Sequence, residues 1–131
     1  MLAVSQQLGI QSELIPRIAT AFGGGIGGRG EVCGAVIGSV MAIGLKYGRE
    51  EPSQPRDKAY TLAREFCQRF QEETGSLSCR ELTGMDISTP EGLKAFQASD
   101  VPLRVCLPAI GAAFRLVMEL LERSDPPATD D

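Results

Sequence analysis

The chain of 131 residues contains no histidine and no tryptophan, and the absence of histidine restricts its chemistry most. Without an imidazole, the protein can hold no Ser-His-Asp triad, no Cys-His nucleophile pair and no histidine-containing metal site. Any general acid or base must then be a carboxylate, a thiol, a lysine or a tyrosine. An enzymatic reaction, if there is one, therefore depends on a short list of side chains that includes the four cysteines.

Long apolar runs and clusters of basic residues are also lacking. The 13 Lys and Arg and 17 Asp and Glu give a net charge of −4, spread along the chain, so nucleic-acid binding is not expected. The longest uncharged apolar segment, residues 32–45, is shorter than the roughly 20 residues that span a bilayer. The N-terminus shows no secretory signal pattern. We therefore expect a cytoplasmic protein without membrane contacts, whose cysteines are free, metal-bound or redox-active.

Strand patterns are missing as well, and in almost every segment the apolar residues have helical spacing. This predicts an all-α fold: a compact single-domain bundle of about five to seven helices with a glycine-rich interhelical loop. The domain is expected over residues 1–123, followed by a disordered acidic tail over residues 124–131. Helices are predicted over residues 1–8, 12–22, 31–47 and 55–74, with short ones after Ser78 and Thr89 and a last one carrying residues 103–121.

The last predicted helix has an apolar stripe that indicates a core-facing side. The members of the stripe are Leu103, Cys106, Leu107, Ile110, Ala113, Phe114, Val117, Leu120 and Leu121. Pro108 must either kink this helix or mark its true start. The helices of Cys33 and Cys106 are expected to pack at the centre of the bundle. A homodimer is also expected, formed by the apolar residues of the first helix, Leu2, Val4 and Leu8.

Glycine is concentrated in one part of the chain, since ten of its fifteen glycines lie between Gly23 and Gly48. Such density indicates a backbone with unusual dihedral angles or close approaches. Residues 23–30 fit the Gly-x-Gly-x-x-Gly dinucleotide fingerprint twice, but that fingerprint needs a preceding strand, which this chain lacks. No Gly-Lys-Ser/Thr follows, so a P-loop is excluded. The favoured interpretation is a tight interhelical connection, with anion binding at the next helix start as the alternative.

Three of the four cysteines, Cys33, Cys79 and Cys106, lie at or near predicted helix starts. The positive end of a helix dipole favours a thiolate, so we expect lowered thiol pKa values there, with Arg80 and Arg104 as helpers. The residues alone leave two interpretations equally open, reactive or ligating thiols and small buried apolar groups. Cys67 lies in the middle of a helix and is interpreted as a packing residue.

A metal site would require distant thiolates to converge. The chain has no Cys-x-x-Cys pair, so neither a zinc ribbon nor a ferredoxin-like cluster is indicated. Convergence of Cys33, Cys79 and Cys106 on a soft metal ion or a small cluster remains an open alternative at this point.

Several short motifs together resemble those of one protein family. Residues 33–38, Cys-Gly-Ala-Val-Ile-Gly, fit the pattern Cys-Gly-Ala-x-x-Gly and follow a Gly-Gly-Gly-Ile-Gly segment. Gly-Leu-Lys-Tyr-Gly at residues 44–48, Cys-Arg-Glu-Leu-Thr-Gly at residues 79–84 and Cys106 in the last helix complete the set. From about Leu2 to Leu121 the chain is thereby similar to the C_GCAxxG_C_C family (CGAxxG motif), described as redox-active and itself similar to a region of split-Soret cytochromes.

The resemblance implies a set of four cysteines, of which the last three correspond to Cys33, Cys79 and Cys106. The first cysteine of the family has no counterpart here, and we expect the chain to enter the helix of that cysteine partway along. Cys67 stands at a position that cannot replace it.

The resulting hypothesis is a thiol-based, oxidoreductase-like redox protein. Two of the three cysteines Cys33, Cys79 and Cys106 would form a reversible disulfide or transfer electrons near the glycine-rich loop, with an unidentified redox partner protein and no required cofactor. Two alternatives remain open. One is a metal or iron–sulfur cluster module that uses the same cysteines, and the other is a non-catalytic structural or interaction domain in which the cysteines only pack.

Overall fold

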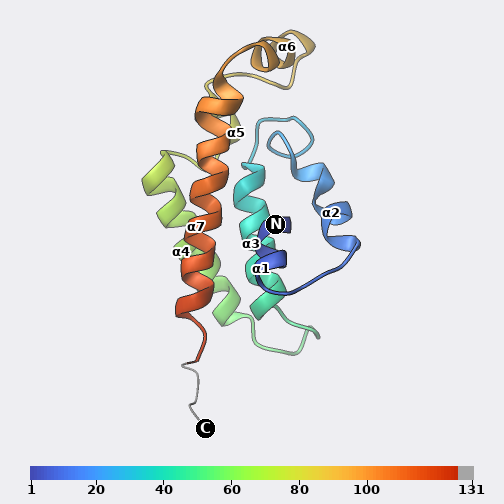
Figure 1. Cartoon of the computed structure of the whole chain (residues 1–131), viewed down its shortest axis with the longest axis vertical. Helices are drawn as coiled ribbons and strands as arrows, with labels where there is room; N and C mark the ends of the chain where they lie inside the picture. The colour runs from blue at the N-terminus through green and yellow to red at the C-terminus, as the bar shows by residue number, and fades with distance from the viewer. Residues whose placement is uncertain (127–131) are drawn as a thin grey trace.

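The computed structural model describes residues 1–126, and over these residues the chain is all-α, as predicted (Figure 1). Seven α-helices follow one another without a strand in this range. A 3₁₀ turn, Thr20–Phe22, extends the second helix, and a π-helical segment, Pro102–Cys106, precedes the last. The helices are α1 Leu2–Gln7, α2 Leu14–Ala19, α3 Gly34–Tyr47, α4 Asp57–Thr74, α5 Cys79–Thr83, α6 Pro90–Ala98 and α7 Leu107–Arg123.

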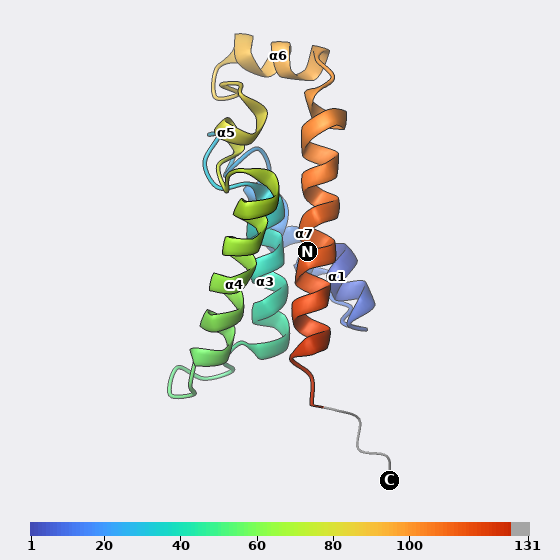
Figure 2. The same ribbon diagram turned by 90° about the vertical axis from the view of Figure 1, so that its left-hand side faces the viewer.

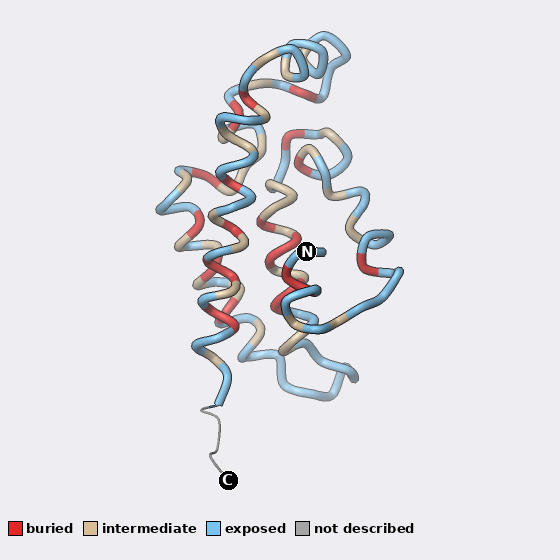
Figure 3. Tube along the Cα trace, in the orientation of Figure 1, coloured by how far each residue is buried: buried red, intermediate tan, exposed pale blue. Residues whose placement is uncertain are grey.

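Three long helices, α3, α4 and α7, lie side by side and form the body of the protein (Figure 2). Buried residues recur along all three of these helices (Figure 3). The Phe66 and Phe70 rings of α4 are stacked with their centroids 5.9 Å apart. The expectation that the helix after Cys33 packs centrally against the last helix is confirmed. The core of these helices consists of Val36, Ala42, Ile43, Leu62, Phe66, Phe70, Ala109, Ala113, Leu116, Val117, Leu120 and Leu121.

The predicted helix caps position the short helices α5 and α6. The Ser78 hydroxyl accepts a hydrogen bond from the Glu81 amide, and the Thr89 hydroxyl accepts one from the Gly92 amide. The Glu81 carboxylate does not return to Ser78, because it accepts a hydrogen bond from the Ser76 hydroxyl instead. Ser76 in turn accepts a hydrogen bond from the Ser78 amide, so the start of α5 is held through two side chains.

The predicted core stripe of the last helix is right for its C-terminal half and wrong for its N-terminal half. Leu120 is fully buried, whereas Leu103, Leu107 and Ile110 are 73%, 58% and 55% exposed. The helical path continues through the π segment into α7, and the proline at Pro108 falls at the α7 start. A proline there has no amide to donate, which suits a change of hydrogen-bond register.

The N-terminal helix α1 packs against α3 and α7 of the same chain. Val4 is only 2% exposed and Leu8 packs against the core, whereas Leu2 is half exposed. A Cβ built on Gly38 would lie 3.0 Å from the Met1 nitrogen, so a glycine lets the two helices approach closely. The suggested dimer surface is therefore wrong for Val4, which the chain itself covers.

The end of α7 is tied to α3 by polar contacts. Asp125 accepts hydrogen bonds from the Lys46 ammonium at 2.7 Å and from the Tyr47 hydroxyl at 2.8 Å. Burial and this hydrogen bond raise the pKa of Tyr47 to about 12. The predicted disordered tail begins at Ser124, but its residues 127–131 lie outside the described residues.

Candidate functional site

The glycine-rich loop after Phe22 is an ordered turn whose backbone is left-handed. Five consecutive residues, Gly24 to Gly28, have φ between 60° and 79°, and Ile26 is the one without glycine's freedom. Backbone hydrogen bonds close the turn from Gly27 to Ala21 and from Glu31 to Gly25. The sequence-based expectation of unusual dihedral angles is confirmed, and it explains why glycines are concentrated here.

Gly25 brings this loop into direct contact with the start of α5. A Cβ built on Gly25 would lie 2.7 Å from the Cβ of Cys79 and 2.6 Å from the amide nitrogen of Glu31. Real Cβ atoms essentially never come this close to other heavy atoms. A glycine at this position is therefore what allows Cys79 to reach the loop.

An isolated antiparallel bridge between Val32 and Ser78 places Cys33 and Cys79 diagonally across a short ribbon. The Cys33 amide donates to the Leu77 carbonyl at 2.8 Å, and the Cys79 amide donates to the Glu31 carbonyl at 2.7 Å. Side chains alternate along an extended backbone, so the residue after each member of a bridged pair points to the same side. Cys33 and Cys79 therefore leave this short ribbon on one face.

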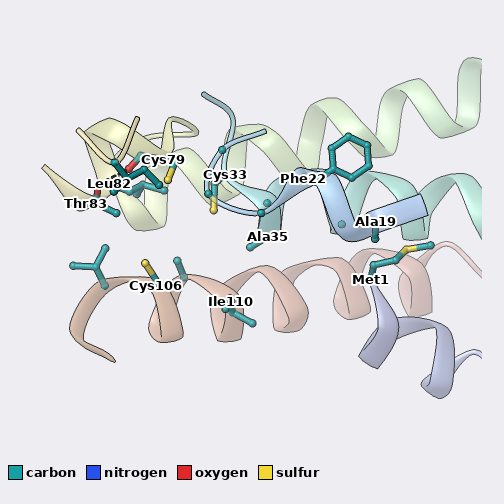
Figure 4. A pocket seen from close by; sticks show the side chains of 18 of the residues that line it. Met1, Ala19, Phe22, Cys33, Ala35, Cys79, Leu82, Thr83, Cys106 and Ile110 are labelled. Carbon is teal, nitrogen blue, oxygen red and sulfur yellow. Dashed lines mark hydrogen bonds between the residues drawn. The ribbon is translucent and has the colours of Figure 1, made fainter. Parts of the chain in front are cut away.

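Cys106 approaches the same place from the π-helical segment. All three thiols line a cavity of about 430 Å³ (Figure 4). In the view of Figure 4 the three cysteines gather at one end of the cavity, whereas Met1 and Ala19 lie at the other. The predicted site residues are thus brought to one cavity by the glycine-rich loop, α3, α5 and the segment before α7.

Burial governs the acidity of two of these thiols. It raises the pKa of Cys79 above its ordinary value, and the charges of Cys33 and Cys106 raise it further. The pKa of Cys106 is also raised, first by burial and then by the charge of Cys33. The expectation that helix starts lower these pKa values is therefore wrong for Cys79 and Cys106. The reason is that α5 spans only five residues and Cys106 lies within a continuous helical path.

The two arginines that were expected to assist the thiols have other partners. Arg80 donates to the carboxylate of Asp86 at 3.2 Å, and Arg104 donates to that of Asp100 at 3.2 Å. Their charges are therefore balanced at the surface.

Cys67 belongs to a different environment. It lies partly buried in α4 against the core and does not line the cavity. Burial raises the pKa of its thiol. The interpretation of Cys67 as a packing residue stays a prediction, and its place against the core agrees with it.

Much of the cavity wall was not identified from the sequence. Phe22, Ile87 and Phe96 contribute side chains, and Gly34 and Ala35 contribute the first turn of α3. Gly34 is the wall residue that the sequence did mark, since it belongs to the Cys-Gly-Ala-x-x-Gly motif. The structure explains the glycine, because a Cβ built there would lie 3.1 Å from the Phe22 carbonyl oxygen. The remaining wall residues come from segments without a shared motif, so only the three-dimensional fold relates them.

The part of the chain that the structure describes contains no set of side chains arranged to bind a metal ion. Among residues 1–126, no three or more Cys, Asp or Glu side chains are grouped so that they could hold a metal ion. No single helix in that range is long and apolar enough to cross a membrane, although the bent pair Pro90–Ala98 and Pro102–Arg123 meets the length and composition criteria together.

Comparison with known proteins gives one match. A family described as "Putative redox-active protein (C_GCAxxG_C_C)" matches residues 1–120. No curated protein and no solved structure matches the chain. The matched range includes Cys33, Cys79 and Cys106 and every helix up to most of α7.

Proposed function

Because the chain belongs to the C_GCAxxG_C_C family of putative redox-active proteins, we propose that it performs thiol–disulfide redox chemistry. Cys33 and Cys79 are the exchanging pair in this proposal, and Cys106 is a third thiol that can exchange with either. The observation that carries the proposal is that all three thiols line one cavity although they lie far apart in the sequence.

The antiparallel bridge supports the choice of the Cys33–Cys79 pair. Both residues leave the ribbon on the same side, directly after Val32 and Ser78. The charge of Cys33 also raises the pKa values of Cys79 and Cys106, which places the Cys33 sulfur within electrostatic reach of both. Because the charge of Cys106 also raises the pKa of Cys79, each of the three thiols lies within electrostatic reach of the other two.

The reaction needs neither histidine nor a bound cofactor. A thiolate on one cysteine attacks an oxidised acceptor, and the second thiol then displaces the reduced acceptor as the S–S bond forms. Two S–H bonds are lost, and two electrons and two protons pass to the acceptor. In the structure all four cysteines are free, which corresponds to the reduced form.

The proposal is tested by equilibrating the protein with mixtures of reduced and oxidised glutathione, followed by acid quenching, alkylation and peptide mass spectrometry. We expect a Cys33–Cys79 disulfide with a potential higher than about −300 mV, the range of exchangeable rather than structural disulfides. Cys79→Ser should abolish this species. Cys67→Ala is the matched control and should leave it unchanged, because Cys67 lies outside the cavity.

The outcomes separate the proposal from the two alternatives. If no disulfide joins any two of the three thiols at any glutathione ratio, and all four cysteines react only in denaturant, the cysteines serve packing alone. Visible absorbance and bound metal in protein purified without oxygen would instead support a metal or cluster module.

A further inference from the structure

The cavity next to the thiols has an unusual chemical lining. Of its lining side chains, none is that of an Asp, Glu, Lys or Arg. Arg80 and Arg104, the cations nearest in sequence to two of the thiols, are paired with aspartates at the surface. The charged group of the wall is the Met1 ammonium, whose pKa is lowered by burial and which lies at the end of the cavity opposite the thiols (Figure 4). Next to the thiols, a ligand with a phosphate or carboxylate group would therefore lose its hydration without gaining a side-chain counter-charge.

The two hydroxyl groups in the wall are already used within the chain. Thr20 donates to the Pro16 carbonyl at 2.6 Å, and Thr83 donates to the Cys79 carbonyl at 2.8 Å. Their hydrogens are therefore unavailable to a ligand, and the thiols are the remaining side-chain donors of the wall. The cavity consequently favours an uncharged and largely apolar molecule.

The size and wall of the cavity indicate a small ring system. Its volume of about 430 Å³ falls in the range of small-molecule sites. The aromatic rings of Phe22 and Phe96 line it, together with backbone that carries no side chain at Gly24, Gly25 and Gly34. Aromatic side chains and bare backbone together leave room for a flat molecule.

We propose that this cavity binds an uncharged apolar organic electron acceptor of the para-quinone class, which the Cys33–Cys79 dithiol reduces. The proposal rests on the proposed thiol–disulfide function and adds the substrate class. In the step, two thiols become one disulfide, and the two electrons and two protons pass to the two ring oxygens to give the hydroquinone. Nicotinamide and flavin nucleotides are disfavoured as ligands of the cavity, because each carries phosphate charge that no side chain next to the thiols balances.

Binding is tested first with a ligand that cannot oxidise the thiols. Tetramethylhydroquinone is titrated into reduced, ¹⁵N-labelled protein, and amide shifts are followed by NMR. We expect saturable shifts of Gly34, Ala35 and Ile110, which line the cavity, and none at the exposed residues of α4, which contributes nothing to the cavity wall. Shifts that do not saturate, or that are spread over the whole surface, would overturn the proposal.

Electron transfer is tested with tetramethyl-para-benzoquinone, whose fully substituted ring resists lasting alkylation by thiols. Ala35→Phe fills the cavity beside Cys33 (Figure 4), and Ala98→Phe is the matched control at an exposed position of α6. We expect Ala35→Phe to lower the rate of quinone reduction by about tenfold or more and Ala98→Phe to leave it within about twofold. Disulfide formation with oxidised glutathione should proceed in both variants.

The second oxidant keeps the two proposals separable. If glutathione oxidises the thiols but the quinone does not, or if filling the cavity leaves quinone reduction unchanged, the acceptor class is wrong and the thiol function stands. If neither oxidant gives a disulfide, the thiol function itself fails. Should Ala35→Phe lose its native circular dichroism, Ala19→Phe fills the opposite end of the same cavity and answers the same question.

Discussion

At the scale of a single residue, burial decides how readily each thiol reacts. Because burial and neighbouring thiol charge raise the pKa of Cys79, we expect it to alkylate more slowly at pH 7 than an unfolded cysteine, whose pKa is about 8.5. Its rate should keep rising about tenfold per pH unit beyond the pH at which an unfolded thiol levels off. Iodoacetamide labelling between pH 6 and 10, read by peptide mass spectrometry, measures this profile.

The same protein in urea provides the control for this measurement, because unfolding removes the burial. There the profiles of Cys79 and Cys106 should converge on that of a free thiol. A plateau of Cys79 labelling below pH 8 in the folded protein would contradict the role assigned to burial.

Gly25 illustrates a second residue-scale constraint, the close approach of a loop to a thiol. Gly25→Ala combines a left-handed backbone with a Cβ that would overlap Cys79 and Glu31, so we expect a loss of about 2–4 kcal/mol in unfolding free energy. Gly27→Ala is the matched control, since Gly27 has the same backbone hand and no atom within 4 Å of a built Cβ. It should lose only about 1–2 kcal/mol. Urea denaturation measures both, and equal losses would show that the approach to Cys79 is unimportant.

The site could be predicted from the sequence to the extent that its residues carry a motif. Cys33, Cys79 and Cys106 were selected by their positions near predicted helix starts and by the family pattern, and the structure brings all three to one cavity. Their pKa shifts could not be predicted, because burial depends on which distant segments cover each sulfur. The Val32–Ser78 bridge was equally invisible, since a single bridged pair leaves no alternating pattern.

At the scale of a helix, the two halves of α7 differ in how far their leucines are buried and therefore in how much these contribute to stability. Leu120 is fully buried between α3 and α4, so Leu120→Ala should lower the unfolding free energy by about 2–5 kcal/mol. Leu107→Ala removes the same atoms from a side chain that is 58% exposed. It should change the free energy of unfolding by about 0.5 kcal/mol or less. Thermal and urea unfolding of the two variants compare the halves directly, and a similar cost for both would place Leu107 in a core that the structure does not show.

The helix positions were largely predictable, whereas the exposed face of α7 was not. Helix signals act locally, so they can be read from the sequence. They are the periodic apolar residues, the caps Ser78 and Thr89 and the terminating glycines Gly75 and Gly84. An apolar stripe tells which side of a helix is apolar, but it does not tell how far a neighbouring helix extends along it. In the part of the stripe from Leu103 to Ile110, Cys106 and Ile110 line the cavity, whereas Leu103 and Leu107 are exposed.

At the scale of the whole molecule, stability should be greatest near neutral pH. Glu65 and Asp125 join α4 and α3 to the end of α7, and the pKa of each is lowered by a hydrogen bond, from Arg123 and Lys46 respectively. A lowered carboxyl pKa contributes stability that is present above the unfolded value, about 4, and is lost as the pH falls through the folded one. The free energy of unfolding should therefore decrease as the pH falls below about 4.

The alkaline limb has the opposite sign. The pKa values of the Cys67, Cys79 and Cys106 thiols are raised, so the stability linked to their protonated forms is present below about 8.5 and is lost as the pH rises toward the folded values. Urea unfolding from pH 3 to 10 should show a plateau between these limbs. Glu65→Gln should flatten only the acid limb and Cys67→Ala only the alkaline one. A free energy of unfolding that keeps rising above about pH 8.5 would contradict the assignment to the thiols, and one that stays level below about pH 4 would contradict the assignment to the carboxylates.

The Val32–Ser78 bridge also has a consequence for the order in which the protein is made. Cys79 follows Cys33 by 46 positions, so at about 5–20 residues per second the ribosome exposes Cys33 several seconds before its neighbour. Cys67 emerges earlier than Cys79 and closes a shorter loop, which makes it the first thiol that a nascent Cys33 can meet. Premature oxidation to a Cys33–Cys67 disulfide would thus join a cavity thiol to one that lies outside the cavity, so we expect folding to require that the new chain stay reduced until α4 has packed.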